Sequence, residues 1–315
     1  MGQSGNPTLA IVGPTASGKT RLAMFLAERF PVEIINADSR QVYRYMDIGT
    51  AKPTAEEQQQ VPHHLLELLN PDQDFSLGVF VTRAKSAEEG IRSRGRLPLL
   101  VGGTGQYIWA LLEGWNVPEI PPDEGFRRAK AREAAEIGSW ALHHELEAVD
   151  PLRASQIDFR NVRRVIRALE IFHVTGQKPS DISDRTTPVR DSLVIGLTLE
   201  RRELYARIDR RVDHMMAAGF LDEVRRLAAM GYRLGTGPLD SLGYRELGQY
   251  LSAVLSLEEA VQRTKFQTHR LARRQYTWFK LADPRIHWLN AADPALETSA
   301  ARLVEDYLRQ RHVVQ

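Results

Sequence analysis

Residues 13–20 read GPTASGKT and match in full the pattern G-x-x-x-x-G-K-[ST], which is typical of a phosphate-binding loop. Immediately before this motif, residues 8–12 form a short apolar run that predicts a buried strand. Residues 17–30 carry apolar side chains at helical spacing and predict a helix. A strand that runs through a glycine-rich turn into a helix is the context in which this motif binds a di- or polyphosphate.

Three more apolar runs predict strands, at residues 32–35, 97–101 and 193–199. Helical stretches separate these runs, and that alternation is typical of crossover units and a parallel sheet. The runs are continuously apolar rather than alternating, which indicates strands that are buried on both faces. We therefore predict an α/β fold with a phosphate-loop-type parallel sheet core that is flanked by helices.

The stretch at residues 116–190 differs from the rest, because it opens with prolines and continues as charged, helical sequence. It lies between the third and fourth predicted strands. We therefore predict a core of residues 1–115 and 191–315, with an inserted all-helical domain at residues 116–190. Beyond the fourth strand the chain is expected to be helical to its end, apart from a glycine-rich loop at residues 231–237.

The phosphate-binding motif supplies its chemistry through the backbone and two side chains. Its glycines let the chain curl so that N–H groups point inward, and the helix N-terminus adds partial positive charge. Lys19 provides a cation for phosphate oxygens, and Thr20 offers a hydroxyl to Mg²⁺. Most such loops bind ATP or GTP, but here the third predicted strand ends in Gly-Gly-Thr-Gly instead of a magnesium-binding aspartate. The loop can therefore hold a diphosphate that departs as well as a γ-phosphate that is transferred.

Polar residues follow two other predicted strands. Asp38 comes after the second strand and Thr104 after the third. Ligands of open parallel sheets bind outside the carboxyl ends of the strands, so these residues and the phosphate loop should converge. The Asp38 carboxylate can accept a proton from an incoming nucleophile, or it can simply cap a helix. The Thr104 hydroxyl can orient a substrate, or it can be an ordinary turn or cap residue.

The composition excludes several classes of protein. The chain has 315 residues, with 42 Lys and Arg against 40 Asp and Glu, so its net charge is only +2. Cysteine is absent, which excludes disulfides, cysteine-ligated zinc and thiol nucleophiles. No apolar run approaches the roughly 18 residues of a membrane span, and we expect no secretion signal in the first residues. We expect a cytoplasmic protein without a membrane partner.

Two basic tracts stand out on this nearly neutral chain. Residues 153–167 hold five arginines and one acid, and residues 260–280 hold six Lys or Arg and no acid. Aromatic residues are interleaved with the charges of the second tract, as in proteins that bind single-stranded nucleic acid. The alternative for either tract is a solvated helix face.

Further segments complete a pattern that resembles the tRNA dimethylallyltransferases. After GPTASGKT, the matching segments are NADSRQVYRYMDIGTAKP at 36–53, LPLLVGGTGQYIWALLEG at 97–114, RRVIRALE at 163–170, RIDRRVDHMMAAGF at 207–220, DSLGYREL at 240–247 and THRLARRQYTWF at 268–279. They occur in the order seen in that family and span nearly the whole chain.

The resemblance implies that a dimethylallyl group is transferred from dimethylallyl diphosphate to the exocyclic amine of an adenine in tRNA, with Mg²⁺ as cofactor. In the family this adenine is position 37, immediately 3′ of the anticodon, in tRNAs that read codons beginning with U. The expected partners are the anticodon stem-loop of tRNA and the diphosphate, and the family expectation is a monomer. The alternatives are an adenylate isopentenyltransferase acting on a free nucleotide, a small-molecule kinase, and a non-catalytic RNA-binding protein.

Residue roles also follow from the resemblance. Asp38 resembles the general base, and Thr104 its partner in positioning the amine. The implied diphosphate-binding residues are Gly13, Pro14, Thr15, Ala16, Ser17, Gly18, Lys19, Thr20 and Arg211, and Thr20 is also the implied metal ligand. The implied tRNA-binding residues are Asp38, Ser39, Arg40, Gln41, Thr104, Arg127, Arg163, Arg164, Arg167, Asp240, Ser241, Gly243, Tyr244 and Arg245.

Overall fold

A computed structural model describes residues 7–182 and 191–311. The chain divides into two compact units. The core unit comprises residues 1–75, 82–112 and 190–315, and the inserted unit comprises residues 76–81 and 113–189.

The boundaries of the inserted unit differ from the predicted 116–190. The unit begins at Glu113 and also takes residues 76–81, which include the start of α3 (Leu77–Ser93). A Cβ added to Gly78 would lie 2.9 Å from the carbonyl oxygen of Pro118, so this first turn packs closely against the segment that opens the insertion. Such a contact between distant parts of the chain leaves no pattern in the sequence.

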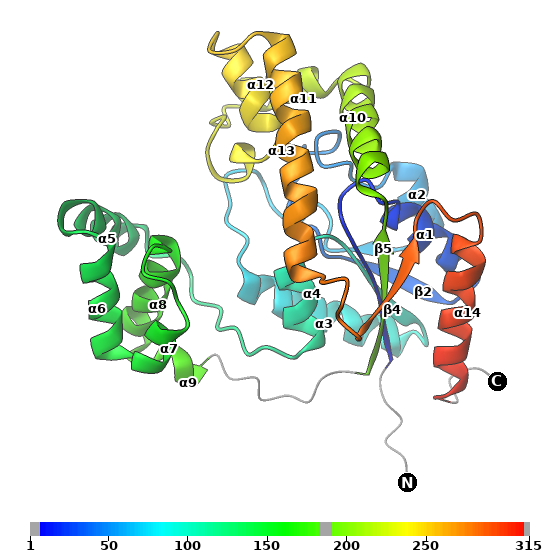
Figure 1. The fold of residues 1–315 in the computed structure, drawn as a ribbon, viewed down its shortest axis with the longest axis horizontal. Helices are drawn as coiled ribbons and strands as arrows, with labels where there is room; N and C mark the ends of the chain where they lie inside the picture. The colour runs from blue at the N-terminus through cyan, green and yellow to red at the C-terminus, as the bar shows by residue number, and fades with distance from the viewer. Residues whose placement is uncertain (1–6, 183–190, 312–315) are drawn as a thin grey trace. The chain divides into compact units, whose positions relative to one another are not determined.

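The described part of the core unit is built on a six-stranded sheet in the order β3-β2-β4-β1-β5-β6 (Figure 1). The strands are β1 (Thr8–Val12), β2 (Val32–Asn36), β3 (His63–His64), β4 (Leu97–Val101), β5 (Ser192–Thr198) and β6 (Ile286–Asn290). Each pair of neighbours is parallel. Every residue of β1 and β2 is buried, including Glu33 and Asn36, the polar residues of β2. Burial of both faces agrees with the position of these strands inside a parallel sheet.

The prediction that the chain is helical beyond the fourth strand is wrong at one place. Residues 286–290 form β6, which pairs with β5 in the register Val194 to Ile286. β6 lies at the edge of the sheet, and only Ile286 among its residues is buried. Its sequence, IHWLN, therefore lacks the apolar run by which the buried strands are recognised. The two-residue β3 at the other edge was missed for the same reason.

Helices cover the sheet and extend beyond its carboxyl end. Those of the core unit are α1 (Lys19–Ala27), α2 (Ala55–Gln60), the greater part of α3, α4 (Gly105–Leu112), α10 (Arg201–Ala217), α11 (Phe220–Ala229), α12 (Tyr244–Leu251), α13 (Leu257–Trp278) and α14 (Leu296–Arg309), with a short 3₁₀ helix at Gly237–Asp240. Leu22 and Leu26 of α1 pack with Val304 of α14 in the cluster that contains the β1 side chains. The long α13 runs from α11 and α12 down to α4 (Figure 1).

The inserted unit contains helices and no strand among its described residues. They are α5 (Glu124–Ile137), α6 (Ser139–Val149), α7 (Pro151–Ser155), α8 (Val162–Thr175) and α9 (Pro179–Ile182). Asp123, Asp150 and Asn161 cap α5, α7 and α8 with their side chains. Leu142 and Leu146 of α6 pack against apolar residues of α8 to form a separate small core. In the described residues of the whole chain, no helix has the length and apolar character needed to cross a membrane.

Candidate active site

The carboxyl ends of three neighbouring strands meet at one edge of the sheet. β2, β4 and β1 are consecutive in the strand order, and each is followed by one of the polar segments singled out from the sequence. Backbone bonds continue beyond the strands: Ala37 N–H donates to the Val101 carbonyl over 2.8 Å, and Gly102 N–H donates to the Ile11 carbonyl over 3.3 Å. Asp38, Thr104 and the phosphate loop are thereby brought together, as expected for an open parallel sheet.

The phosphate loop takes backbone conformations that need glycine. Gly13 has φ +137°, and a Cβ there would lie 2.5 Å from the Leu197 carbonyl oxygen of β5. Gly18 has φ +93° and directly precedes α1, which begins at Lys19 rather than at the predicted residue 17. The Ser17 hydroxyl is buried and has no hydrogen-bond partner among the residues that the structure describes. An unpartnered buried hydroxyl in such a loop suits a site that is completed by a ligand.

Two cations and one carboxylate gather at this loop. The ammonium of Lys19 donates to the carbonyl oxygens of Gly13 at 3.0 Å and Pro14 at 2.8 Å. Burial and the nearby Arg211 guanidinium lower the pKa of Lys19 to about 8, whereas Asp38 acts in the opposite direction. Burial also lowers the pKa of Arg211, against the attraction of Asp38. Lys19 and Arg211 are therefore close enough to repel each other, and an anion between them would relieve that repulsion.

Asp38 is held by its neighbours in a turn. Asn36 accepts from Asp38 N–H at 3.0 Å, and the Asn36 amide donates to the Asp38 carbonyl at 3.1 Å. One carboxylate oxygen of Asp38 accepts from Arg40 N–H at 2.9 Å. No helix begins within residues 37–54, so the alternative that Asp38 caps a helix is wrong. The half-buried carboxylate stays at the strand end beside the phosphate loop.

Thr104 connects the end of β4 to the end of β2 through hydrogen bonds. Its hydroxyl oxygen accepts from Ser39 N–H at 3.1 Å, and its own N–H donates to the Ala37 carbonyl at 3.2 Å. A hydroxyl that accepts one hydrogen bond still has its own hydrogen to donate. Thr104 directly precedes α4, so it stands at the place of a helix cap and is also tied to the Asp38 segment.

The other residues of the Asp38 segment differ in exposure. The Arg40 side chain is exposed. The Gln41 side chain is half-buried, and its amide donates to the carbonyls of Thr50 and Ala51 at 3.1 and 3.0 Å. Gln41 therefore holds the following loop, and Arg40 is free to face solvent.

The DSLGYREL stretch mixes surface and core residues. Asp240 is exposed, Ser241 donates to the Pro238 carbonyl at 2.6 Å, and Arg245 pairs with Glu246 at 2.7 Å. Gly243 has φ +84°, and a Cβ there would lie 2.5 Å from the Phe220 ring. Tyr244 is only 1% exposed, and its hydroxyl donates to Glu223 at 2.7 Å. The Tyr244 ring therefore belongs to the core, and the contact of residue 244 with tRNA stays a prediction.

Glu223 is a buried residue that sequence reasoning missed. Its carboxylate accepts from the backbone N–H groups of Asp47, Ile48 and Gly49 at 2.8–3.1 Å, besides the Tyr244 hydroxyl. The signal was present in the helical spacing, because position 223 falls on the same face of α11 as its buried residues Phe220, Val224 and Leu227. A carboxylate on an apolar helix face needs several hydrogen-bond donors. Here the backbone of residues 47–50 (the DIGT loop) supplies three of them.

The four arginines predicted to bind tRNA in the inserted unit fall into two pairs. Arg127 and Arg167 both pair with the fully buried Glu170, at 2.8 and 2.5 Å, and Arg167 also donates to the Ile120 carbonyl. Arg163 and Arg164 lie exposed on the first turn of α8, and no ion pair to them is formed by the described residues. The first pair is thus engaged within the unit, and the second is available to a polyanion.

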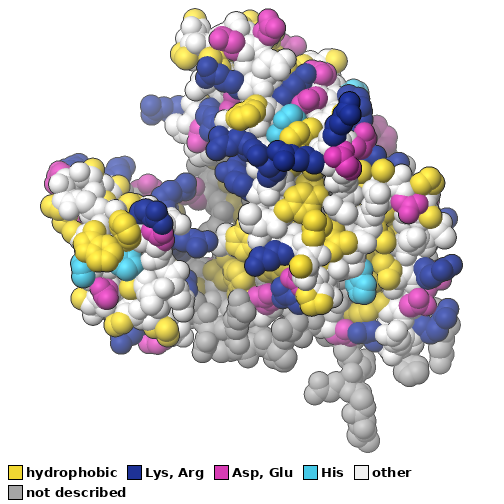
Figure 2. Space-filling model, viewed as in Figure 1, with side chains coloured by type: hydrophobic (Ala, Val, Ile, Leu, Met, Phe, Trp, Pro, Cys, Tyr) yellow, Lys and Arg dark blue, Asp and Glu magenta, His cyan; other side chains and the backbone are white. Residues whose placement is uncertain are grey.

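A basic band crosses the face that α10 and α13 form on the core unit (Figure 2). Arg263, Arg270, Arg273 and Arg274 of α13 are exposed and form no ion pair with the described residues. Phe266 and Trp278 of the same helix are 56% and 37% exposed. The second basic tract therefore has both free cations and accessible rings, which single-stranded nucleic acid requires.

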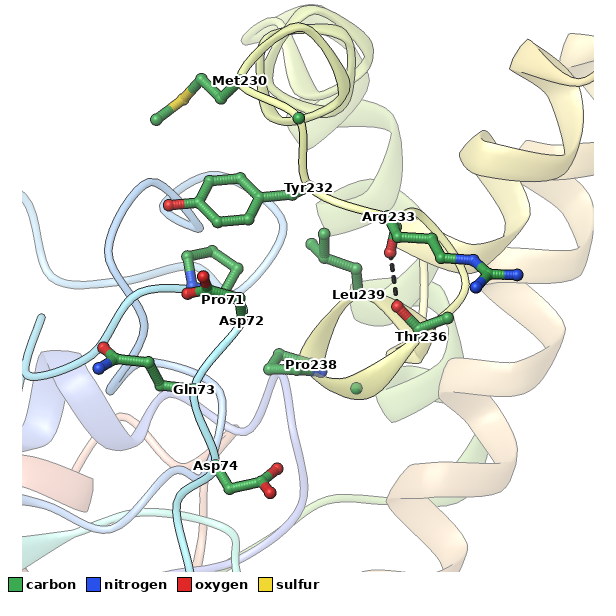
Figure 3. A pocket seen from close by; sticks show the side chains of 12 residues that line it. Pro71, Asp72, Gln73, Asp74, Met230, Tyr232, Arg233, Thr236, Pro238 and Leu239 are labelled. Atoms are coloured by element: carbon green, nitrogen blue, oxygen red, sulfur yellow. Dashed lines mark hydrogen bonds between the residues drawn. The ribbon is translucent and has the colours of Figure 1, made fainter. Parts of the chain in front are cut away.

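A pocket of about 590 Å³ lies elsewhere in the core unit, between the loop at 71–74 and the segment at 230–239 (Figure 3). Asp72, Asp74, Tyr232 and Pro238 are among its lining residues, and Thr236 there donates to the Arg233 carbonyl at 2.8 Å. It contains none of the residues predicted to act on the substrate. Its two aspartates also make it unsuitable for a polyphosphate.

A parallel sheet whose first strand enters a phosphate loop, with cations and one carboxylate at the strand ends, defines an α/β protein of the phosphate-loop type. The IPP transferase family model matches residues 41–282 of the chain. A tRNA dimethylallyltransferase from Roseiflexus castenholzii is 52% identical over 274 residues, which cover 87% of this chain and 90% of the relative. The chain therefore belongs to the IPP transferase family and is a prenyl-transferring enzyme.

Solved structures agree with this assignment. The tRNA isopentenylpyrophosphate transferase from Bacillus halodurans is 40% identical, covers 98% of both chains and superposes with a TM-score of 0.72. A eukaryotic dimethylallyltransferase, whose crystal structures describe it acting on tRNA, is 28% identical and superposes with a TM-score of 0.82. The likeness to it covers 98% of this chain and 81% of the eukaryotic chain.

Proposed function

We propose that this enzyme transfers the dimethylallyl group of dimethylallyl diphosphate to the exocyclic amine of adenine 37 in tRNAs that read codons beginning with U. The observation that carries the proposal is the meeting of Asp38, Thr104 and the phosphate loop at the ends of β2, β4 and β1. One edge of the sheet thus offers a diphosphate site and a proton acceptor side by side. Residues with these two roles are needed when an amine displaces a diphosphate.

The loop at 13–20 and Arg211 form the diphosphate site. Lys19 and Arg211 neutralise the charge that grows on the leaving oxygens as the allylic carbon–oxygen bond breaks. The described residues hold no cluster of three or more His, Asp or Glu side chains fit for a metal ion. Mg²⁺ usually takes substrate phosphates plus one or two protein oxygens, and the Thr20 hydroxyl supplies such an oxygen. When bound, the ion adds positive charge beside the leaving group.

Asp38 acts on the other reactant. The adenine amine is a poor nucleophile because its lone pair is delocalised into the ring. As the nitrogen–carbon bond forms, the amine must lose a proton, and the Asp38 carboxylate accepts it. The Thr104 hydroxyl donates its free hydrogen to the base and orients it. The base leaves the anticodon stack to reach these groups.

The tRNA backbone is bound by the free cations. Arg163 and Arg164 of the inserted unit and the exposed arginines of α13 make no ion pairs with described residues that phosphates would have to displace. Such contacts give affinity without sequence preference, and exposed loop bases supply the specificity. The inserted unit is in this proposal a tRNA-binding domain, and the enzyme acts in the cytoplasm as a monomer.

Incubation of the protein with Mg²⁺, dimethylallyl diphosphate and unmodified tRNA tests the proposal. One adenine, 3′ to the anticodon, should be labelled, and absence of label at saturating substrate would reject the proposal. Free AMP is the competitor that separates an adenylate isopentenyltransferase from an enzyme acting on RNA. A kinase would instead consume ATP with a hydroxyl substrate and need no isoprenoid. The free cations and exposed rings of α13 favour RNA over AMP.

A further inference from the structure

One side chain outside all the predicted sets joins the phosphate loop to the turn after β4. Gln275 lies on α13, and only 8% of the residue is exposed. Its carbonyl oxygen accepts from Thr15 N–H at 2.8 Å, and its amide nitrogen donates to the Gly103 carbonyl at 3.0 Å. The oxygen of this buried amide therefore bonds to the phosphate loop, and its nitrogen bonds to the turn after β4.

The fit around Gln275 leaves no room for adjustment. A Cβ on Gly103 would lie 2.1 Å from the Gln275 amide nitrogen. The end of α13 is also fixed: a Cβ on Gly105 would lie 2.3 Å from Trp278, and the Trp109 indole donates to the Trp278 carbonyl at 3.0 Å. Because the helix is locked against α4, Gln275 holds the loop and the turn at one distance from each other.

The contacts continue to the residues that act on the amine. Gly103 precedes Thr104, and the Thr104 hydroxyl accepts from Ser39 N–H, next to Asp38. A chain of hydrogen bonds therefore runs from Thr15 through Gln275 and the turn to the Asp38 segment. The Thr15 N–H group is directed to Gln275, so it does not point toward a phosphate as a simple reading of the motif expects. Its neighbour Ala16 has φ +62°, a strained conformation that this bond helps to hold.

We propose that Gln275 is a positioning residue that sets the distance between the departing diphosphate and the attacking amine. Its acceptor fixes the diphosphate loop, and its donor fixes the turn that carries Thr104. The inference rests on the proposed function, because it concerns the geometry of the same displacement. Reacting atoms must be held close and aligned, and a misplacement of about 1 Å costs roughly 100-fold in rate.

Two substitutions separate the two halves of the amide. Gln275→Leu removes both hydrogen bonds, whereas Gln275→Glu keeps an acceptor for Thr15 N–H and, in its ionised form, has no donor for the Gly103 carbonyl. The matched control is Tyr276→Phe, one residue along α13, which removes a 3.0 Å bond to Thr198 of β5 and no described hydrogen bond to either segment. Each protein is assayed for single-turnover rate, KM for tRNA, binding of magnesium pyrophosphate by calorimetry, and thermal unfolding.

We expect Gln275→Leu to lower the single-turnover rate roughly 10- to 100-fold while KM for tRNA stays within about threefold. Gln275→Glu should lose rate but keep pyrophosphate affinity near that of the wild type, because the loop stays anchored. Tyr276→Phe should match the wild type in rate. If Gln275→Leu does not fold, Gln275→Glu decides alone.

A wild-type single-turnover rate in Gln275→Glu would overturn the inference, as would a loss that only follows the fraction of folded protein. An inactive wild-type enzyme would instead reject the proposed function. In that case pyrophosphate binding still tests the contact with Thr15. Equal pyrophosphate affinity in Gln275→Leu and the wild type would overturn the inference that Gln275 fixes the phosphate loop.

Discussion

The backbone N–H of Ser39 donates to the Thr104 hydroxyl oxygen over 3.1 Å, and this bond joins the segment after β2 to the turn after β4. Because Ser39 directly follows Asp38, the carboxylate and the hydroxyl are held by a shared contact. The free hydrogen of Thr104 and the free oxygen of Asp38 can then act on one amine. The pairing comes from the neighbouring positions of β2 and β4 in the sheet.

The first prediction concerns Asp38. Asp38→Asn keeps an oxygen for the Arg40 N–H group but cannot take a proton, so turnover should fall by roughly 10²- to 10⁴-fold. Affinity for tRNA, measured by filter binding, should stay near that of the wild type. Asp72→Asn, in the exposed loop of the separate pocket, is the control and should leave turnover unchanged. Unchanged turnover in Asp38→Asn would reduce Asp38 to a residue that only shapes its turn.

The second prediction concerns pH. The pKa of Lys19 is lowered to about 8 in the free protein, so Lys19 is protonated below that pH and becomes neutral above it. An anion binds the protonated form, and therefore pyrophosphate affinity should fall as the pH rises through about 8. Calorimetry from neutral to alkaline pH measures this. Pyrophosphate itself gains and loses protons over this pH range. At each pH the affinity of the wild type is therefore divided by the affinity of Lys19→Met, and the ratio no longer contains the titration of the ligand. A ratio that is flat with pH would show that Lys19 does not bind the diphosphate.

The third prediction separates the two arginine pairs of the inserted unit. Arg163→Ala should weaken tRNA binding and reduce the slope of log affinity against log salt by about one, as loss of one phosphate contact does. Arg127→Ala should instead lower the free energy of unfolding by roughly 1–2 kcal/mol, because Glu170 loses a partner but keeps Arg167. Denaturant unfolding and salt-dependent binding of both variants are measured together. An unchanged salt slope for Arg163→Ala would remove α8 from the tRNA interface.

The fourth prediction concerns Tyr244 and Glu223. Tyr244→Phe leaves Glu223 with three backbone donors and should cost about 1 kcal/mol of unfolding free energy, with tRNA affinity unchanged. Glu223→Ala leaves three N–H groups of the DIGT loop without their acceptor and should cost several times more, roughly 3–5 kcal/mol. Denaturant unfolding provides both values. If Tyr244→Phe lost tRNA affinity while its unfolding free energy stayed at the wild-type value, Tyr244 would be part of the tRNA interface.

The sequence did not reveal one strand at the edge of the sheet, and it did not show which side chains turn inward. β6 was missed because an edge strand needs no continuous apolar run. Tyr244, Arg127 and Arg167 stand in segments expected to contact tRNA, yet one is buried and two are paired to Glu170. A segment's resemblance cannot tell which of its side chains face the solvent, because that depends on what packs against it.

The sequence by itself determined the chemistry that depends on neighbours along the chain. The glycines at 13 and 18, Lys19 and Thr20 follow one another in a strand, loop and helix, and the apolar runs specify buried parallel strands. The tertiary structure decided the partners that are far apart in sequence. Gln275 meets Thr15 across 260 positions, and Glu223 meets the DIGT loop across more than 170. The reason is physical: a buried polar group needs a partner, and only the packing of strands and helices determines which one comes within reach.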